Sequence, residues 1–312
     1  MELNRIKMVH ISKTFFQIPG IGSFSMADKR RRGDRKDGVL LRDVDSYHKI
    51  MPFLMPRRTE CEVFFCESID MTNLLAYIEL KKSEGSNITL FSVFVATAVR
   101  TATIRPALNR FICGQRMYER KTVDVGFIAK KYFGDEAEES AIKIPFEKGA
   151  DIFEVTDKIY SQVHGVREGG SVGSDGVVEK VAKLPRFMKR FIARFLRFLN
   201  YYGKVPESIS SSDPNFSSIF ISNMGSIQAG APFHHLNEWG TNSVFLCIGK
   251  MYEKLCMEDG KVVSRQYIDF AFTVDERISD GYYFARTLDV FREIILNPEV
   301  LEKPFSGREV PT

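Results

Sequence analysis

The chain has 312 residues with a formal net charge of +4, and 44% of its residues are hydrophobic while 27% are charged. These proportions are typical of a soluble globular protein with a large core, and they predict one large domain or two small ones. The net charge is too small for a nucleic-acid-binding polycation, so we expect no nucleic acid partner.

Cysteine usage and the hydrophobic profile indicate the compartment. The five cysteines are an odd number without a Cys-x-x-Cys pair, which argues against a disulfide framework or a zinc site and favours a reducing compartment. No apolar run approaches the roughly 20 residues that span a bilayer. Arg5, Lys7, His10 and Lys13 interrupt the segment where a secretory signal would lie. We therefore expect a cytoplasmic protein without a metal cofactor.

Taken in chain order, the hydrophobic pattern predicts a basic arm followed by alternating strands and helices. The arm, residues 1–38, concentrates basic side chains between Lys29 and Lys36, which is typical of a solvated turn-rich segment or of a contact patch. Strands are predicted at 60–69, 110–118, 123–130, 142–146, 217–222, 244–250 and 264–274, and helices at 71–83, 90–104, 151–163, 184–203 and 280–296.

The order of these elements indicates the fold class. Helices mixed with non-adjacent strands, without a detectable repeat, predict an α/β or α+β fold. We assign residues 39–303 to this domain and 304–312 to a C-terminal tail. Residues 166–176 hold four glycines and two serines, so we expect a flexible loop there.

Two short motifs carry a resemblance to known acyltransferases. The first lies between a predicted strand and a helix and reads Asp275-Glu276-Arg277-Ile278-Ser279-Asp280-Gly281. The second reads Phe220-Ile221-Ser222-Asn223-Met224-Gly225. The chain resembles chloramphenicol acetyltransferase and the dihydrolipoamide acyltransferase component of 2-oxo-acid dehydrogenase complexes. Both groups carry His-x-x-x-Asp-Gly at this strand-to-helix junction, and this chain departs from them at Glu276.

The resemblance covers roughly residues 40–298 and includes weaker matches. Arg105-Pro106-Ala107-Leu108-Asn109 is similar to a family turn, and Val123-Asp124-Val125-Gly126-Phe127 is similar to the strand after it. Tyr47-His48-Lys49 is similar to the family's N-terminal Trp-His-Arg region. We expect no lipoyl domain and no lipoyl group in this chain, which is then not a complete dehydrogenase-complex subunit.

The resemblance implies a fold, a chemistry and an assembly. The fold is the chloramphenicol-acetyltransferase-like α/β fold, an α+β two-layer sandwich with a mixed sheet and packed helices. Family members transfer an acyl group between coenzyme A and a hydroxyl or thiol, as homotrimers with active sites between subunits. By that carry-over Ser222 stabilises the oxyanion, beside a structural Asn223. Arg277 and Gly281 are structural at the site, and Gly281 permits close backbone approach. Asp280 shapes the loop, with Lys49 as a candidate partner.

Glu276 occupies the position of the catalytic base in the family. A glutamate with a pKa near its unperturbed value of ~4.3 is a poor base for a thiol or an alcohol, unless burial raises that pKa. Three alternatives stay open: Glu276 is a working base, the base has moved, or transfer activity is lost while the fold is kept. For a moved base the candidates are His234 and His235, of which at most one would face the site if they lie on a strand, and more distantly His48.

A basic amphipathic helix is predicted from Leu184 to Gly203, with Pro185 at its first position. Its arginines form one stripe, and a broad face carries Phe187, Phe191, Phe195, Leu196, Phe198, Leu199 and Tyr202. It suits packing on the domain or on a neighbouring subunit, an anionic membrane surface, or a basic lid over the phosphates of coenzyme A.

Two functions follow from these observations. The first is an acyltransferase that uses coenzyme A thioesters and an unidentified acceptor. The second is a catalytically inactive trimeric binding or scaffold protein, peripherally associated with a membrane through the helix at 184–203.

Overall fold

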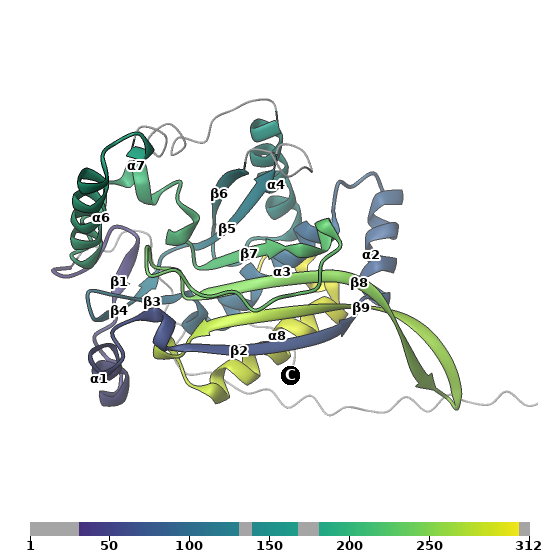
Figure 1. Cartoon of the computed structure of the whole chain (residues 1–312). Coiled ribbons are helices and arrows are strands. Elements are labelled where there is room, and N and C mark those ends of the chain that lie inside the picture. Colours follow the sequence, from purple (N-terminus) through teal and green to yellow (C-terminus); the bar gives the residue numbers. More distant parts are fainter. Residues whose placement is uncertain (1–30, 131–138, 168–180, 306–312) are drawn as a thin grey trace, which may run out of the picture.

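The computed structural model describes residues 31–130, 139–167 and 181–305 (Figure 1). The strands are β1 (Gly38–Leu40), β2 (Glu62–Asp70), β3 (Arg110–Cys113), β4 (Arg116–Arg120), β5 (Val123–Lys130), β6 (Glu139–Phe146), β7 (Ile219–Asn223), β8 (Val244–Glu258) and β9 (Lys261–Asp275). The helices are α1 (Ser46–Leu54), α2 (Thr72–Ser83), α3 (Leu90–Ile104), α4 (Ile152–Arg167), α6 (Arg186–Tyr201), α7 (Glu207–Ser210) and α8 (Gly281–Leu296). Short 3-10 turns include η4 (Met224–Ile227) and η5 (Glu276–Ile278).

Most of the described strands form one six-stranded sheet in the order β2-β9-β8-β7-β5-β6. The sheet is mixed, because β7 runs parallel to both β5 and β8 while the other neighbours are antiparallel. A smaller sheet pairs β1, β4 and β3. The predicted α/β class with a mixed sheet and packed helices is confirmed.

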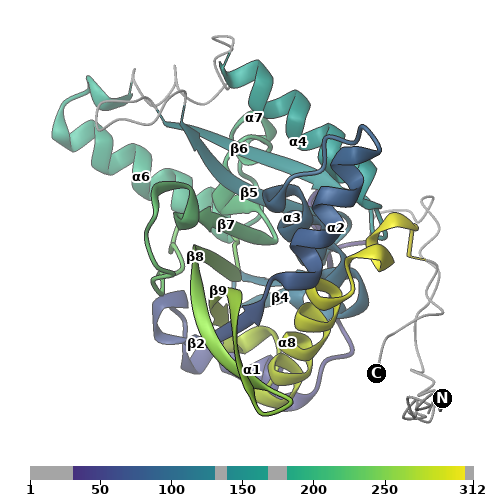
Figure 2. The same cartoon turned by 90° about the vertical axis from the view of Figure 1, so that its right-hand side faces the viewer.

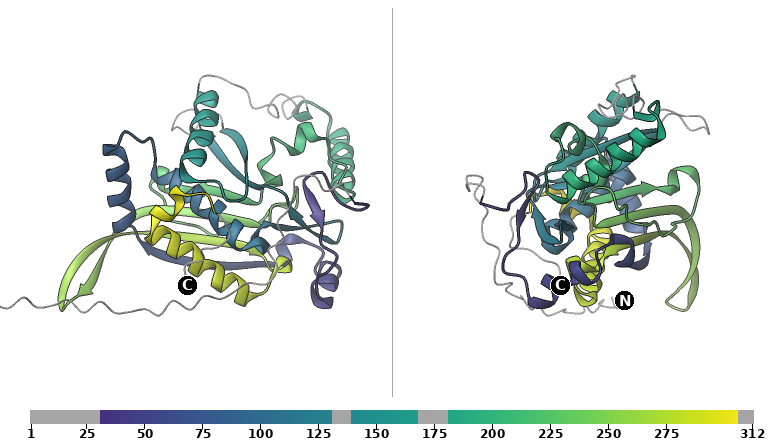
Figure 3. Two further views of the ribbon diagram at one scale, coloured as in Figure 1. Left: turned by 180° about the vertical axis from the view of Figure 1, so that it is seen from behind. Right: turned by 60° about the vertical axis from the view of Figure 1, so that its left-hand side comes forward.

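One face of the large sheet is covered by helices. Side chains of α2, α3, α4 and α8 share a single apolar core with alternate residues of the strands. Figure 2 shows the helical layer on one side of the sheet, and Figure 3 shows the same layer from behind. Helix α3 is buried over most of its length, and Thr89 caps it in a reciprocal pair of hydrogen bonds with Ser92.

The opposite face of the sheet has no helix on it among the described residues. The parallel strands β7 and β8 need a connection that returns along the sheet, and residues 224–243 supply it without an α-helix. This return segment runs along β8 on the side turned to the viewer in Figure 1. Its Leu236 packs with Phe245, Cys247 and Ala271 in a second, smaller core. We call this surface the open face.

Several predicted boundaries change. The strand expected at 110–118 is a hairpin of β3 and β4, because Gly114 and Gln115 take left-handed conformations and reverse the chain. Pro185 precedes the first residue of α6 rather than occupying it. Helix α4 continues to Arg167, into the start of the predicted glycine-rich loop, whose residues 168–176 lie outside the described residues.

The end of the basic arm is only partly solvated. Arg35 is buried, its guanidinium donates to Asp37 at 2.8 Å, and it lies over the rings of Phe111 and Tyr118. Burial opposes ionisation of Asp37, but the hydrogen bond and charge of Arg35 outweigh it and lower the pKa of that carboxyl. Residues 1–30 of the arm lie outside the described residues.

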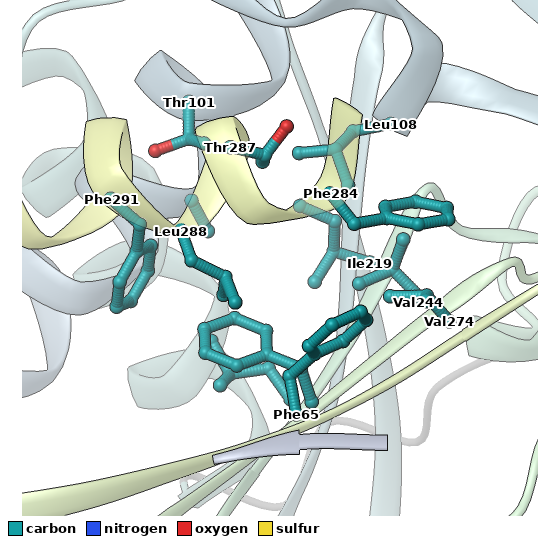
Figure 4. A pocket seen from close by; sticks show the side chains of 13 residues that line it. Phe65, Thr101, Leu108, Ile219, Val244, Val274, Phe284, Thr287, Leu288 and Phe291 are labelled. Carbon is teal, nitrogen blue, oxygen red and sulfur yellow. The ribbon is translucent and has the colours of Figure 1, made fainter. Parts of the chain in front are cut away.

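A small cavity lies in the core between α3, α8 and the sheet (Figure 4). Its volume is about 30 Å³, and its lining is almost entirely apolar, with Phe65, Phe284 and Leu288 among the walls. The space suits about one water molecule. It is therefore an imperfection of core packing and not the candidate active site.

Candidate active site

Ser222 projects from the open face near the end of β7. Along this strand Ile219 and Ile221 belong to the helix-covered core, so strand alternation turns Phe220 and Ser222 to the other side. The side chain is half-buried, and its Oγ contacts the sulfur of Met224 at 3.5 Å. A thioether is a weak acceptor. The hydroxyl is therefore not committed to a strong backbone bond and is able to donate to a bound group.

Glu276 does not share a pocket with Ser222 within one chain. Ser222 is in register with Cys247 on β8, and Cys247 is in register with Ala271 on β9. Glu276 lies five residues beyond Ala271, in η5. With strand rises of about 3.3 Å and spacings of about 4.8 Å, the two Cα atoms are roughly 19 Å apart. A site that joins them would need a second copy of the chain.

Arg277 lies in a buried network of hydrogen bonds and ion pairs. Its guanidinium donates two hydrogen bonds to Asp275, at 2.8 and 2.7 Å, and a third to the Met55 carbonyl. Arg58 lies 3.8 Å from the same carboxylate. Burial lowers the pKa of Arg58, whereas the Asp275 carboxylate outweighs burial and raises the pKa of Arg277. The buried network fixes the turn that carries Glu276.

The remaining motif residues shape the backbone. Asp280 caps α8 by accepting the amide of Tyr283 at 2.7 Å, and no described hydrogen bond joins it to Lys49. A Cβ at Gly281 would meet no atom of the described residues within 4 Å, so no described part of the same chain approaches this glycine closely. Asn223 ends β7, and its carbonyl accepts the hydroxyl of Ser226 at 2.7 Å.

The two adjacent histidines lie on the return segment and not on a strand. Their rings therefore do not point to opposite sides but stack, with centroids 4.6 Å apart. The His234 ring also lies flat on Phe245, at 4.0 Å and 11°. Phe245 stacks in turn on Phe220, at 4.8 Å. This stack places His234 on the open face, the face that carries Ser222.

Hydrogen bonding defines the tautomer of His234. Its Nδ1 lies 2.7 Å from the carbonyl oxygen of His235, and a carbonyl only accepts, so Nδ1 carries the proton. Nε2 of the neutral ring then holds a lone pair, and no described residue donates to it. His235 instead places its Nε2 3.2 Å from Asn237. Of the two, His234 has the arrangement of a general base.

The separation between His234 and Ser222 suits a shared substrate. Phe245, which supports His234, is the diagonal neighbour of Ser222, at roughly 8 Å on such a sheet. The same face carries Cys247, whose pKa burial raises to about 11, so it is a neutral thiol at physiological pH. Cys247 and Ala271 are both buried and pack with Leu236, so they form an apolar floor beneath this face.

Glu62 fixes the return segment, and sequence reasoning missed it. Its Oε1 accepts the buried amide of Leu236 at 2.6 Å, two residues after His234. Further along, Glu238 accepts both the amide and the hydroxyl of Thr59. Glu62 begins β2 on the open face, so its position was predictable, but its long-range partner had no local signal in the sequence.

His48 lies elsewhere, on α1, a helix absent from the sequence prediction. Its Nδ1 pairs with Asp45, which also caps the helix. Helix α1 packs beside η5, near Glu276 rather than near Ser222. His48 therefore has a capping partner and no place on the open face.

A basic cavity of about 600 Å³ lies between α6 and the turn that carries Glu276. Four arginines, Arg57, Arg58, Arg197 and Arg277, line it together with Glu238. Arg58 and Arg277 already hold Asp275, so Arg57 and Arg197 are the arginines of this lining that suit the phosphates of a nucleotide-like cofactor. No cluster of His, Cys, Asp or Glu side chains within the described ranges is placed to hold a metal ion.

Comparison with known proteins identifies the architecture. Residues 206–302, which include both motifs, match the family model of the 2-oxoacid dehydrogenases acyltransferase (catalytic domain). Over these residues the chain is similar to that catalytic domain. It is 20% identical over 233 residues to the lipoamide acyltransferase component of the branched-chain alpha-keto acid dehydrogenase complex of Bacillus subtilis (strain 168), covering 73% of this chain and 45% of that protein.

Solved structures of the acyltransferases share the fold. The cubic core of the pyruvate dehydrogenase multienzyme complex superposes with a TM-score of 0.54 at 16% identity, over 91% of this chain and 99% of that one. A chloramphenicol acetyltransferase superposes with a TM-score of 0.50 at 13% identity, over 83% and 99%. The predicted family resemblance is confirmed. The chain spans about half the length of the curated relatives it matches.

Proposed function

We propose that this protein is an acyltransferase that moves an acyl group from a coenzyme A thioester to a hydroxyl or thiol acceptor. The observation that carries the proposal is the pairing of Ser222 and His234 on the open face of one chain. A hydroxyl without a strong partner and an imidazole with a free Nε2 lone pair flank an apolar floor. These are the two groups that acyl transfer requires.

The reaction follows from these positions. Nε2 of His234 accepts the proton of the acceptor hydroxyl or thiol as its oxygen or sulfur attacks the thioester carbonyl. The Ser222 hydroxyl donates a hydrogen bond to the oxyanion of the tetrahedral intermediate. When that intermediate collapses, the carbon–sulfur bond breaks, and the leaving thiolate of coenzyme A takes the proton from the His234 imidazolium. The Nδ1–H bond to the His235 carbonyl orients the imidazole throughout.

Glu276 has a different role in this proposal. It lies in a turn that the hydrogen bonds between Asp275 and Arg277 hold in place. Its Cα atom is roughly 19 Å from that of Ser222 in the same chain. In a homotrimer with sites between subunits, Glu276 of a neighbouring copy would reach the open face and help to bind the acceptor. We propose this trimer as the working assembly and the cytoplasm as its compartment. The four-arginine cavity is our candidate for the phosphates of coenzyme A.

The release of free coenzyme A from acetyl- and longer acyl-coenzyme A, with a small thiol or alcohol as acceptor, tests the function. Ser222→Ala should lower kcat by about 10²–10³-fold, the usual effect of one oxyanion donor. Ser222→Thr keeps the hydroxyl and should retain more of the rate. Ser226→Ala is the matched control, because that exposed hydroxyl bonds only to the Asn223 carbonyl.

The alternative function predicts a different outcome. An inactive scaffold would release no coenzyme A with any donor, and Ser222→Ala would then behave as wild type in every assay. Turnover that is unchanged in Ser222→Ala would contradict the site while leaving open another acyl-transfer centre in the chain.

A further inference from the structure

Helix α6 is anchored to the body at its C-terminal end. Asn200 is its buried residue, and the side-chain amide donates to the Gly240 carbonyl at 3.2 Å. The guanidinium of Arg35 donates to the Asn200 carbonyl at 3.2 Å, a favourable place for a cation at a helix C-terminus. Tyr201 donates to Gln115 at 2.9 Å. From this anchor the helix runs along the edge of the molecule, apart from the helical layer (Figures 1 and 2).

The exposure of its side chains divides α6 into three lengthwise stripes. Half-buried Ile192, Leu196 and Leu199 face the body together with Asn200, so the two leucines do not belong to the predicted aromatic face. At 100° per residue the next stripe is aromatic, and its members are exposed by 50–72%: Phe187, Phe191, Phe195, Phe198 and Tyr202. The third stripe, beside the aromatic one, consists of Arg186, Arg190, Arg194 and Arg197.

Neither exposed stripe has a partner within the part of the chain that the structure describes. The arginines of α6 form no ion pair with a described residue, and the helix contains no acidic residue. The aromatic stripe leaves five rings in contact with water, which is unusual for side chains of this size. No described helix is long and apolar enough to cross a membrane. The helix therefore has the composition of one that lies in a membrane interface rather than through it.

We propose that α6 binds an anionic phospholipid surface, with its aromatic stripe inserted among the acyl chains and its arginines on the lipid phosphates. Sixteen helical residues span roughly 24 Å. Over that length a bilayer presents negative headgroups directly above hydrocarbon, which matches adjacent arginine and phenylalanine stripes. A protein partner would need an acidic stripe and an apolar groove side by side over the same distance.

Helix α6 is oriented so that it can contact the lipid surface while it stays packed on the body of the protein. The body-facing stripe stays packed, since it lies on the side opposite to the boundary between the aromatic and arginine stripes. The basic cavity continues this surface, because Arg197 of α6 lines it together with Arg57. Binding would therefore hold the protein at the membrane with that cavity close to the headgroups.

Vesicle co-sedimentation of the full chain tests the proposal. The protein should sediment with phosphatidylserine-containing vesicles, much less with phosphatidylcholine vesicles, and less as salt is raised, because salt screens the arginine–phosphate attraction. Arg190→Glu/Arg194→Glu should weaken binding at least about tenfold, given that each basic residue near an anionic surface contributes substantially. Phe191→Ser/Phe195→Ser should also weaken it, even at low salt.

A matched control makes the same change in net charge outside α6. Lys82→Glu/Arg286→Glu replaces two exposed basic residues far along the chain from α6 and should sediment as wild type does. Equal binding to neutral vesicles, no binding to anionic ones, or equal loss in this control would overturn the proposal. A lipid-free oligomer that the α6 variants dissociate, with no vesicle binding, would assign the stripes to a second copy instead. Circular dichroism of each variant establishes that α6 still forms.

Discussion

The imidazole of His234 lies flat on the ring of Phe245, with ring centroids 4.0 Å apart and an angle of 11° between the planes. This contact ties a residue of an irregular return segment to the floor of a regular sheet. Because Phe245 is buried and stacks on Phe220 next to Ser222, the position of the histidine is defined relative to the serine. The site is thus held by aromatic packing rather than by a secondary-structure element of its own.

Glu62 should act as a positioning residue for His234. Glu62→Ala removes the acceptor of the Leu236 amide, and an unpaired buried amide costs about 1–3 kcal/mol. The return segment then loosens, so we expect a lower kcat with a smaller change in KM. Glu62→Gln retains an acceptor oxygen and should restore most of the rate. Glu60→Ala, which removes only an exposed pair with Arg57, serves as the control; an equal effect there would refute the role.

Thiol labelling should separate the five cysteines into two groups. Cys61, Cys113 and Cys247 are buried, whereas Cys66 is exposed and Cys256 is partly exposed. Burial raises the pKa of Cys61 and of Cys247 to about 11, so neither forms appreciable thiolate at neutral pH. Mass spectrometry after brief iodoacetamide treatment should find label on Cys66 and Cys256 before it appears on the three buried cysteines. Rapid labelling of Cys247 in the native protein would contradict the packing of the open face.

The same two thiols give stability a definite pH dependence. A raised pKa in the folded state means that the neutral thiol favours folding. Its contribution is complete below the unfolded value near ~8.5 and is lost as the pH rises from there to about 11. The thermal midpoint should therefore fall over this alkaline window, and less steeply in Cys247→Ala. A midpoint that rises across the window would show the opposite sign of linkage.

Asp275 should be among the most sensitive positions for folding. Asp275→Asn leaves Arg277 and Arg58 buried beside a neutral group, and breaking a buried pair in this way costs about 3–5 kcal/mol. Urea unfolding followed by circular dichroism gives the free energy of unfolding. Asp289→Asn removes only surface pairs on α8 and should cost less than about 1 kcal/mol. Similar losses in the two variants would mean that the buried network adds no stability.

Regular elements of this fold were predictable because their patterns are local. The alternation of Phe220, Ile221 and Ser222 assigns the serine to the face opposite the core without any structural information. Likewise, the periodicity of α8 and the aspartate before it predict both the helix and its cap. The spacing of its arginines likewise predicts the basic stripe of α6.

The arrangement of the site depends on contacts that no local pattern encodes. Adjacent histidines suggest opposite orientations only if the segment is extended, and the return segment is not. Glu276 stands in a family motif, yet its distance from Ser222 emerges from strand register. The division of α6 into a packed leucine side and an exposed phenylalanine side follows from where the body lies, which sequence periodicity does not reveal.

One comparison tests the central claim directly: initial rates of coenzyme A release for His234→Gln, His235→Gln and Glu276→Gln, each measured beside wild type. Loss of the general base should lower kcat by about 10²–10⁴-fold in His234→Gln. His235→Gln should keep a rate close to that of wild type. If Glu276→Gln loses that activity while His234→Gln keeps it, the base is Glu276 and the account given for His234 is wrong.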